Sequence, residues 1–128
     1  MLNHFKIPSK SFNGPVLITG AGGCIGAWTM AMLLKEGIEV VACDLTNNKK
    51  RPELLIENGE LAKVPWVEGD ISDTDYVLNT IEKYNPESII HLAAKIGFKV
   101  NNKINWRYSF NAAAPILPGF SKQKDFVL

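Results

Sequence analysis

The segment VLITGAGGCIGAW, residues 16 to 28, constrains the fold of this 128-residue chain more than any other stretch. Four apolar or β-branched residues lead into a cluster of glycines, and a segment with helical spacing follows. Gly20 can make a tight turn, because glycine tolerates backbone angles that other residues avoid. Gly23 lets the backbone approach a bound group, and Gly26 lets the helix lie close to the strand. The segment therefore predicts a strand, a turn and a helix whose N-terminus offers unpaired N–H groups and a positive dipole end to a phosphate.

Short apolar runs alternate with longer amphipathic segments along the rest of the chain. The runs predicted to be strands are residues 15–19, 38–44, 64–70 and 88–94. Continuous runs rich in β-branched residues are typical of a parallel sheet that is covered on both faces. The order strand, helix, strand therefore predicts a Rossmann-like α/β fold, a right-handed doubly wound parallel sheet.

Three helices are expected between these strands. The first has an apolar face formed by Ile25, Trp28, Met32 and Leu33. The second, over residues 51–62, is marked by Leu54, Leu55 and Leu61. The third starts at Ser72, a capping residue with Asp75 three places on, and Pro86 closes it. Its apolar face is expected to contain Val77, Leu78 and Ile81.

The two ends of the chain differ from this regular middle. Residues 1–14 are interpreted as a flexible tail, and residues 15–128 as one incomplete Rossmann-like domain. The last residues, DFVL (125–128), resemble the start of a fifth strand, so the predicted sheet is truncated there.

Composition excludes several classes of protein. The net charge of +1 offers no basic excess for nucleic acid, and no apolar run approaches the ~18 residues that cross a bilayer. Cys24 and Cys43 are too few for a disulfide framework and lack metal spacing, so both are expected to be small buried side chains. A cytoplasmic protein without a metal site is the default expectation.

An acidic residue supports a dinucleotide at the glycine turn. Asp44 closes the second predicted strand, 24 residues after Gly20, where a carboxylate accepts hydrogen bonds from ribose hydroxyls. Such a carboxylate repels a 2′-phosphate, so NAD is favoured over NADP. Lys49, Lys50 and Arg51 would soften that preference if they reached the site, but a solvated basic loop is the favoured interpretation.

Three motifs in order resemble one known family. TGAGGCIG (19–26) resembles the T-G-x-x-G-x-x-G fingerprint of the extended short-chain dehydrogenases/reductases, the NAD-dependent epimerase/dehydratase family. VEGDISD (67–73) and IIHLAA (89–94) are similar to the ends of that family's third and fourth strands, and SFNAAA (109–114) is similar to a later V-N-x-x-G-T segment.

The resemblance implies roles for residues at these positions. Asp70 would bind the adenine amino group, and the Ile71 backbone N–H would contact the ring. The residues expected to bind the cofactor are Gly20, Gly23, Cys24, Ile25, Gly26, Asp44, Asp70, Ile71, Leu92, Ala93, Ala94 and Asn111. Two alternatives stay open: Asp70 could only order the loop before the third helix, and His91 is interpreted as a packed, hydrogen-bonded core residue rather than a catalytic base.

The catalytic signature of that family is not present in these residues. The family uses Tyr-x-x-x-Lys, in which the tyrosine transfers a proton while hydride moves to or from the nicotinamide. Here the residues four places after the three tyrosines are Thr80, Ser88 and Ala112. No catalytic residue is therefore predicted, and the chain alone is expected to be inactive.

Three functions follow as hypotheses. The first is the NAD-binding portion of an oxidoreductase acting on a nucleotide sugar or related polyol, with a second copy or a C-terminal half as partner. The second is a non-catalytic NAD-binding or regulatory module that completes its sheet with a partner, because strand edges recruit strands. The third is a flavodoxin-like mononucleotide protein, against which Asp44 argues.

Overall fold

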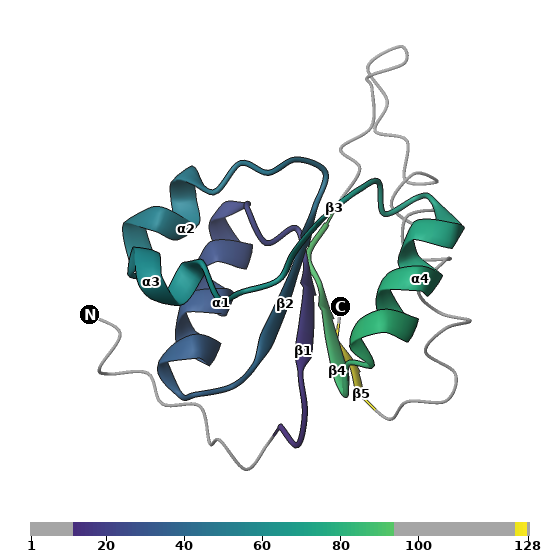
Figure 1. The fold of residues 1–128 in the computed structure, drawn as a ribbon, viewed down its shortest axis with the longest axis horizontal. Coiled ribbons are helices and arrows are strands. Elements are labelled where there is room, and N and C mark those ends of the chain that lie inside the picture. Colours follow the sequence, from purple (N-terminus) through teal and green to yellow (C-terminus); the bar gives the residue numbers. More distant parts are fainter. Residues whose placement is uncertain (1–11, 94–124, 128) are drawn as a thin grey trace.

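The computed structural model describes residues 12–93 and the backbone of residues 125–127. Its strands are β1 (Val16–Thr19), β2 (Val40–Asp44), β3 (Trp66–Glu68), β4 (Ser88–His91) and β5 (Asp125–Val127). They form one sheet in the order β3-β2-β1-β4-β5, and every pair is parallel. The predicted doubly wound sheet is confirmed, including a strand near residue 125 (Figure 1).

Helices cover both faces of this sheet. They are α1 (Cys24–Lys35), α2 (Lys50–Leu55), α3 (Asn58–Leu61) and α4 (Thr74–Tyr84). Figure 1 shows α1, α2 and α3 on one side of the strands and α4 on the other. Among the described residues, no helix is long and apolar enough to cross a bilayer.

The core consists of two apolar layers on opposite faces of the sheet. Val16 and Ile18 of β1 pack in the layer that contains Met30 of α1. Leu17, between them, packs in the other layer with Val77 of α4. Successive side chains of a strand point to opposite faces, so a strand covered on both sides must be apolar at every position.

The buried face of α1 is not the predicted one. Ile25 is 68% exposed, Trp28 and Met32 are half-buried, and only Leu33 of the predicted set is buried. The residues that are buried are Gly26, Ala27, Met30, Ala31 and Leu33. The rotation of α1 is set by Gly26, which lies against the backbone of the glycine turn, and the small residues on the same side let the helix approach the sheet closely.

The single helix predicted over residues 51–62 is divided into α2 and α3. Ile56 between them has an extended backbone and is buried in the core. Leu61 is also buried, as expected, whereas Leu54 is 83% exposed. Burial of Ile56 requires the chain to leave the helix there, which periodicity alone does not reveal.

The cap of α4 also differs from the prediction. The N-cap is Asp73, whose side chain accepts hydrogen bonds from the backbone N–H groups of Asp75 and Tyr76. The helix ends at Asn85, which has a left-handed backbone, directly before Pro86. Of the predicted apolar face, Val77 is buried and Ile81 half-buried, but Leu78 is 39% exposed. Because the Asp73 carboxylate caps the helix, the Ser72 side chain is not needed as the cap.

Candidate functional site

A cleft of about 440 Å³ opens where the chain leaves the carboxyl ends of β1, β2, β3 and β4. The chain runs from β1 outward to β2 and β3 on one side, and then crosses back from β3 to β4 on the other side of β1. Ligands of doubly wound sheets bind at this kind of switch point. The predicted site residues that line the cleft are Gly20, Gly23, Asp44, Asp70, Ile71, Leu92 and Ala93.

A larger cavity, of about 610 Å³, lies at the opposite end of the sheet. Its walls include Pro15, Gly37 and Pro65, which stand just before β1, β2 and β3. None of the predicted site residues line it. The cleft at the carboxyl ends is therefore the candidate site.

The glycine turn forms the floor of the cleft. Gly20 has φ +73°, a left-handed conformation, and a Cβ there would lie 2.8 Å from the backbone nitrogen of Ala93. The Gly23 N–H donates to the Gly20 carbonyl, at 3.1 Å, and closes the turn. A Cβ on Gly26 would collide with that same carbonyl. Glycine at these positions permits the turn and the close contact of α1 with it.

The first residues of α1 lie outside the cleft walls. Cys24 is exposed, not buried as the sequence suggested, and neither Cys24 nor Ile25 lines the cleft. Both sit at the helix end, where side chains project into solvent rather than toward the sheet. Gly26 is buried behind the turn.

Asp44 is held rigidly at the edge of the cleft. Its Oδ2 accepts the Gly22 N–H at 2.7 Å, and its Oδ1 accepts the Leu45 N–H at 2.7 Å. A Cβ on Gly22 would lie 2.8 Å from the Asn48 carbonyl oxygen. Gly22, to which the sequence assigned no role, thus allows the turn and the loop after β2 to meet.

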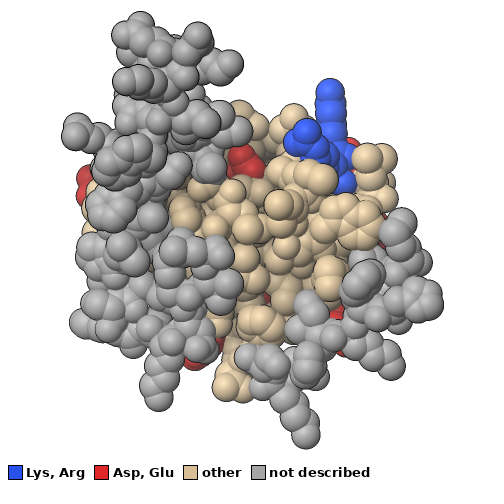
Figure 2. Space-filling view, turned by 180° about the vertical axis from the view of Figure 1, so that it is seen from behind, with Lys and Arg blue, Asp and Glu red and all other residues tan. Residues whose placement is uncertain are grey.

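Arg51 is exposed, as the sequence suggested, but it also belongs to the cleft wall. It lines the cleft, and its Nη1 is 3.5 Å from the Gly22 carbonyl oxygen. Lys50 is exposed as expected, and Lys49 lies 5.3 Å from the centre of the Trp66 ring. Figure 2 shows basic side chains gathered at one corner of a face that otherwise carries few charges where it is described. The sequence does not show which of these three basic residues lies at the cleft, and the tertiary structure shows that it is Arg51.

The loop after β3 brings Asp70 and Ile71 to the cleft. Asp70 Oδ1 accepts hydrogen bonds from the Ser72 N–H, at 2.9 Å, and the Ser72 hydroxyl, at 2.6 Å. The alternative role of Asp70, ordering the loop before α4, is therefore present. Because Asp70 also lines the cleft, the two roles are compatible.

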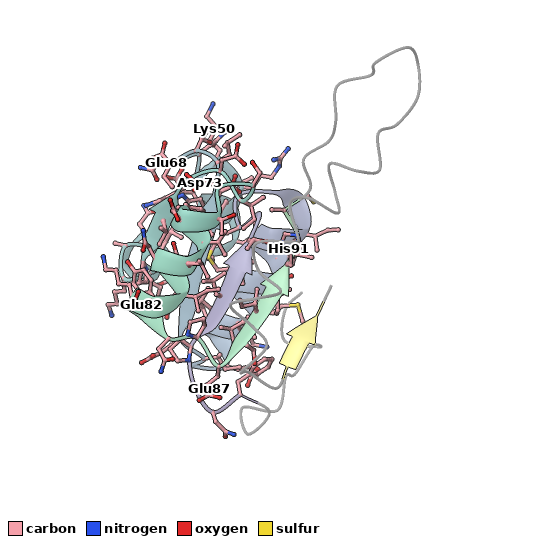
Figure 3. The ribbon with its side chains drawn as sticks, turned by 90° about the vertical axis from the view of Figure 1, so that its right-hand side faces the viewer. Lys50, Glu68, Asp73, Glu82, Glu87 and His91 are labelled. Atoms are coloured by element: carbon pink, nitrogen blue, oxygen red, sulfur yellow. The ribbon has the colours of Figure 1, made fainter. Side chains whose placement is uncertain are left out.

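His91 is a buried, hydrogen-bonded residue, as interpreted from the sequence. Figure 3 shows it at the carboxyl end of β4, with Glu87 at the opposite end of that strand. Its Nδ1 is 2.7 Å from the Thr19 hydroxyl oxygen, which also accepts the N–H groups of Leu92 and Ala93. Because those two bonds use the oxygen's lone pairs, its proton is donated to Nδ1. Burial lowers the pKa of His91, so the imidazole is neutral and ties β4 to β1.

We expect stability to fall as the pH is lowered below the usual histidine range, near 6.5. The folded state lowers the His91 pKa, so the unfolded state binds the proton first. The slope is at most about 1.4 kcal/mol per pH unit, the value for one proton. Urea unfolding between pH 5 and 7.5 measures it, and His91→Gln should abolish this part of the slope. An unchanged slope in that variant would contradict the assignment.

Two predicted site residues, Ala94 and Asn111, lie outside the described residues. Several residues line the cleft without having been predicted to do so. These are Thr19, Gly22, Cys43, Leu45, Thr46, Asn48, Arg51, Gly69 and Tyr76. Thr19 had a signal in the sequence, since a hydroxyl directly before a glycine turn can bond to the backbone of a neighbouring strand.

Comparison with known proteins agrees with this geometry. The family model described as GDP-mannose 4,6 dehydratase matches residues 17–108. A UDP-glucose 4-epimerase of Klebsiella pneumoniae is 37% identical over 79 residues, which are 61% of this chain and 57% of that protein. A CDP-paratose 2-epimerase of Salmonella typhi is 32% identical over 81 residues, 63% of this chain and 24% of that protein.

A solved structure shares the fold and a part of the sequence. The UDP-glucose 4-epimerase of Thermus thermophilus, in complex with NAD, matches with a TM-score of 0.65 and 25% identity, over 83% of this chain and 33% of that one. The present chain therefore spans only part of each of these relatives. Since the family model covers most of the chain, the chain belongs to the GDP-mannose 4,6 dehydratase family, within the NAD-dependent epimerases/dehydratases of the extended short-chain dehydrogenase/reductase type.

Proposed function

We propose that this chain is the NAD-binding portion of an epimerase/dehydratase-type oxidoreductase that acts on a nucleotide sugar or a related polyol. The observation that carries the proposal is the cleft in which the glycine turn, Asp44 and Asp70 meet at the carboxyl ends of the strands. The names of the relatives, UDP-glucose 4-epimerase and CDP-paratose 2-epimerase, support the substrate class. The NAD complex of the Thermus thermophilus enzyme supports the cofactor.

The backbone around the glycine turn would hold the pyrophosphate. Gly20, Gly22 and Gly23 line the cleft without side chains, and α1 begins at Cys24 directly after them. The first N–H groups of a helix lack acceptors within the helix, and its dipole is positive at that end. Gly26 acts indirectly, by holding α1 against the turn, while Cys24 and Ile25 would contribute their backbone N–H groups.

The remaining residues would hold the adenosine and the ribose next to the pyrophosphate. Asp44 accepts hydrogen bonds from ribose hydroxyls, and its charge disfavours a 2′-phosphate, so we propose NAD rather than NADP. Asp70 and the Ile71 N–H would meet the adenine. Leu92 and Ala93, which line the cleft, would contact the ribose. Ala94 and Asn111 would also bind the cofactor.

The bound dinucleotide would supply a hydride acceptor and donor at its nicotinamide ring. The residues of this chain bind and orient it. No tyrosine of the sequence is followed by lysine four places later, so we propose that the 128-residue chain by itself turns over no substrate. We also propose a cytoplasmic location and one NAD(P)-binding domain over residues 15–128.

We expect the purified chain to bind NAD weakly and saturably, with a Kd of about 0.1–1 mM. ADP-ribose should bind about as tightly, because the contacts described lie at the adenosine and pyrophosphate. Isothermal titration calorimetry measures both ligands, and Gly23→Val is the control that fills the turn and should abolish binding. A folded chain that binds neither ligand would refute the cofactor proposal, and epimerisation of UDP-glucose by this chain would refute its inactivity.

One observation favours the second candidate, a non-catalytic module that completes its sheet with a partner. β5 is an edge strand, paired only with β4 in the part of the sheet that the structure describes. Exposed strand edges pair readily with other strands. If that partner is a second copy of this chain, light scattering of the purified chain should show a dimer rather than a monomer.

A further inference from the structure

We propose that Tyr76 is a positioning residue that holds the loop after β3 in the shape required to recognise adenine. The inference rests on the proposed function, because it concerns how this chain would distinguish adenine from another base. The resemblance that identified Asp70 and Ile71 assigns nothing to Tyr76.

The Tyr76 ring lies directly against the backbone of this loop. A Cβ built on Gly69 would overlap the ring, with Cζ at 2.8 Å. Gly69 has an ordinary backbone conformation, since it is not among the positive-φ glycines. Glycine is therefore needed at position 69 because of the ring beneath it, and the ring supports the residue immediately before Asp70.

The Tyr76 hydroxyl fastens the ring to the end of β3. It donates a hydrogen bond of 2.7 Å to the Val67 carbonyl oxygen. It also lies within hydrogen-bonding reach of the Cys43 thiol, and burial raises the pKa of Tyr76 and brings that of Cys43 to about 11. Both groups are thus neutral, and the hydroxyl gives its single proton to Val67 of β3, so that toward the Cys43 thiol of β2 it can only accept.

The other side of the loop is held as well. Ile71 packs on the same apolar layer as Tyr76, under α4. Ser72 binds the Asp70 carboxylate, and Asp73 caps the helix that carries Tyr76. Figure 3 shows Asp73 at the same end of the molecule as Lys50, the end at which the cleft opens. The backbone on both sides of Asp70 is therefore supported by α4, and Tyr76 supplies the contact at Gly69.

The consequence is a preference for one base. A carboxylate accepts a hydrogen bond from the adenine amino group but meets a repulsive carbonyl oxygen in hypoxanthine. A hydrogen bond to a charged group distinguishes the two bases by about tenfold or more, provided that the carboxylate is held in place. Removing the Tyr76 support should lower this discrimination without removing the pyrophosphate contacts on the other side of the cleft.

The experiment compares NAD with nicotinamide hypoxanthine dinucleotide, in which a carbonyl replaces the adenine amino group. Calorimetric Kd values are measured for the unaltered chain and for Tyr76→Leu and Tyr76→Phe. The ratio of the two Kd values should fall from about tenfold to about twofold in Tyr76→Leu, because NAD loses a well-placed acceptor and the hypoxanthine dinucleotide meets less repulsion. Tyr76→Phe keeps the ring against Gly69 but loses the hydroxyl, so its ratio should lie between those of the unaltered chain and Tyr76→Leu. Tyr84→Phe, at the far end of α4 beside the other cavity, is the matched control and should leave the ratio unchanged.

A second variant tests the contact itself. Gly69→Ala as a single substitution should lower the ratio of the two Kd values, because the new methyl group displaces the Tyr76 ring. Combined with Tyr76→Leu, it should have no further effect on that ratio. A merely structural tyrosine would weaken both dinucleotides equally, which would overturn the inference while NAD binding persists. If the unaltered, folded chain binds neither dinucleotide, the proposed function fails, and this inference fails with it.

Discussion

Gly26→Ala should destabilise the fold by about 2–4 kcal/mol, although alanine is the better helix former. Gly26 is buried in α1, and the added methyl group would collide with the Gly20 carbonyl oxygen. The methyl carbon is bonded directly to the α1 backbone and the oxygen belongs to the backbone of the turn, so either α1 or the glycine turn must move. Urea unfolding followed by circular dichroism gives the change in the free energy of unfolding.

Gly59→Ala is the matched control for this substitution. Gly59 is also helical, in α3, and a Cβ there would meet nothing within 4 Å. That variant should be neutral or stabilised by up to about 1 kcal/mol, as expected from helix propensity. Equal effects at the two positions would show that α1 does not lie against the turn as described.

Asp44→Ala should change the ratio of NAD to NADP affinity by about 100-fold in favour of NADP. The variant loses a charged acceptor for the ribose hydroxyls and also the charge that repels a 2′-phosphate. Arg51 lines the same cleft and would then face the phosphate without an opposing carboxylate. Fluorescence or calorimetric titration with both dinucleotides measures the ratio.

Two further variants separate charge from structure at this site. Asp44→Asn keeps an oxygen that can accept the Gly22 or Leu45 N–H but removes the charge, so it should follow Asp44→Ala in direction. Arg51→Ala added to Asp44→Ala should remove most of the gain in NADP binding. A ratio that stays constant across this series would disprove the role of Asp44 in choosing the cofactor.

Local sequence patterns predicted those parts of the molecule that depend on neighbouring residues along the chain. The apolar runs at β1, β2 and β4 predicted strands because a strand covered on both faces must be apolar throughout. The spacing of Gly20 and Gly26 predicted a tight turn and a closely packed helix, and both features are present.

Errors occurred where a second contact, long-range or local, competes with the one that was predicted. The large residues Ile25 and Trp28 suggested the buried face of α1, but close contact between Gly26 and the turn rotates the helix the other way. Ser72 suggested the cap of α4, but Ser72 binds Asp70, and Asp73 takes the cap. At α1, packing against the turn selected the buried face, whereas at α4 the choice between two neighbouring caps follows from the local bond between Ser72 and Asp70.

By itself, the sequence determined the parallel α/β sheet, the turn at Gly20 and the approach of Asp44 and Asp70 to the carboxyl edge of that sheet. These features depend on hydrophobic period and on backbone freedom, which are properties of short segments. Only the tertiary structure decided that Arg51 lines the cleft while Lys49 lies over Trp66, and that the Tyr76 ring lies beneath Gly69. These contacts join segments whose relative rotation is set by close packing across the sheet, and periodicity within one segment does not contain that information.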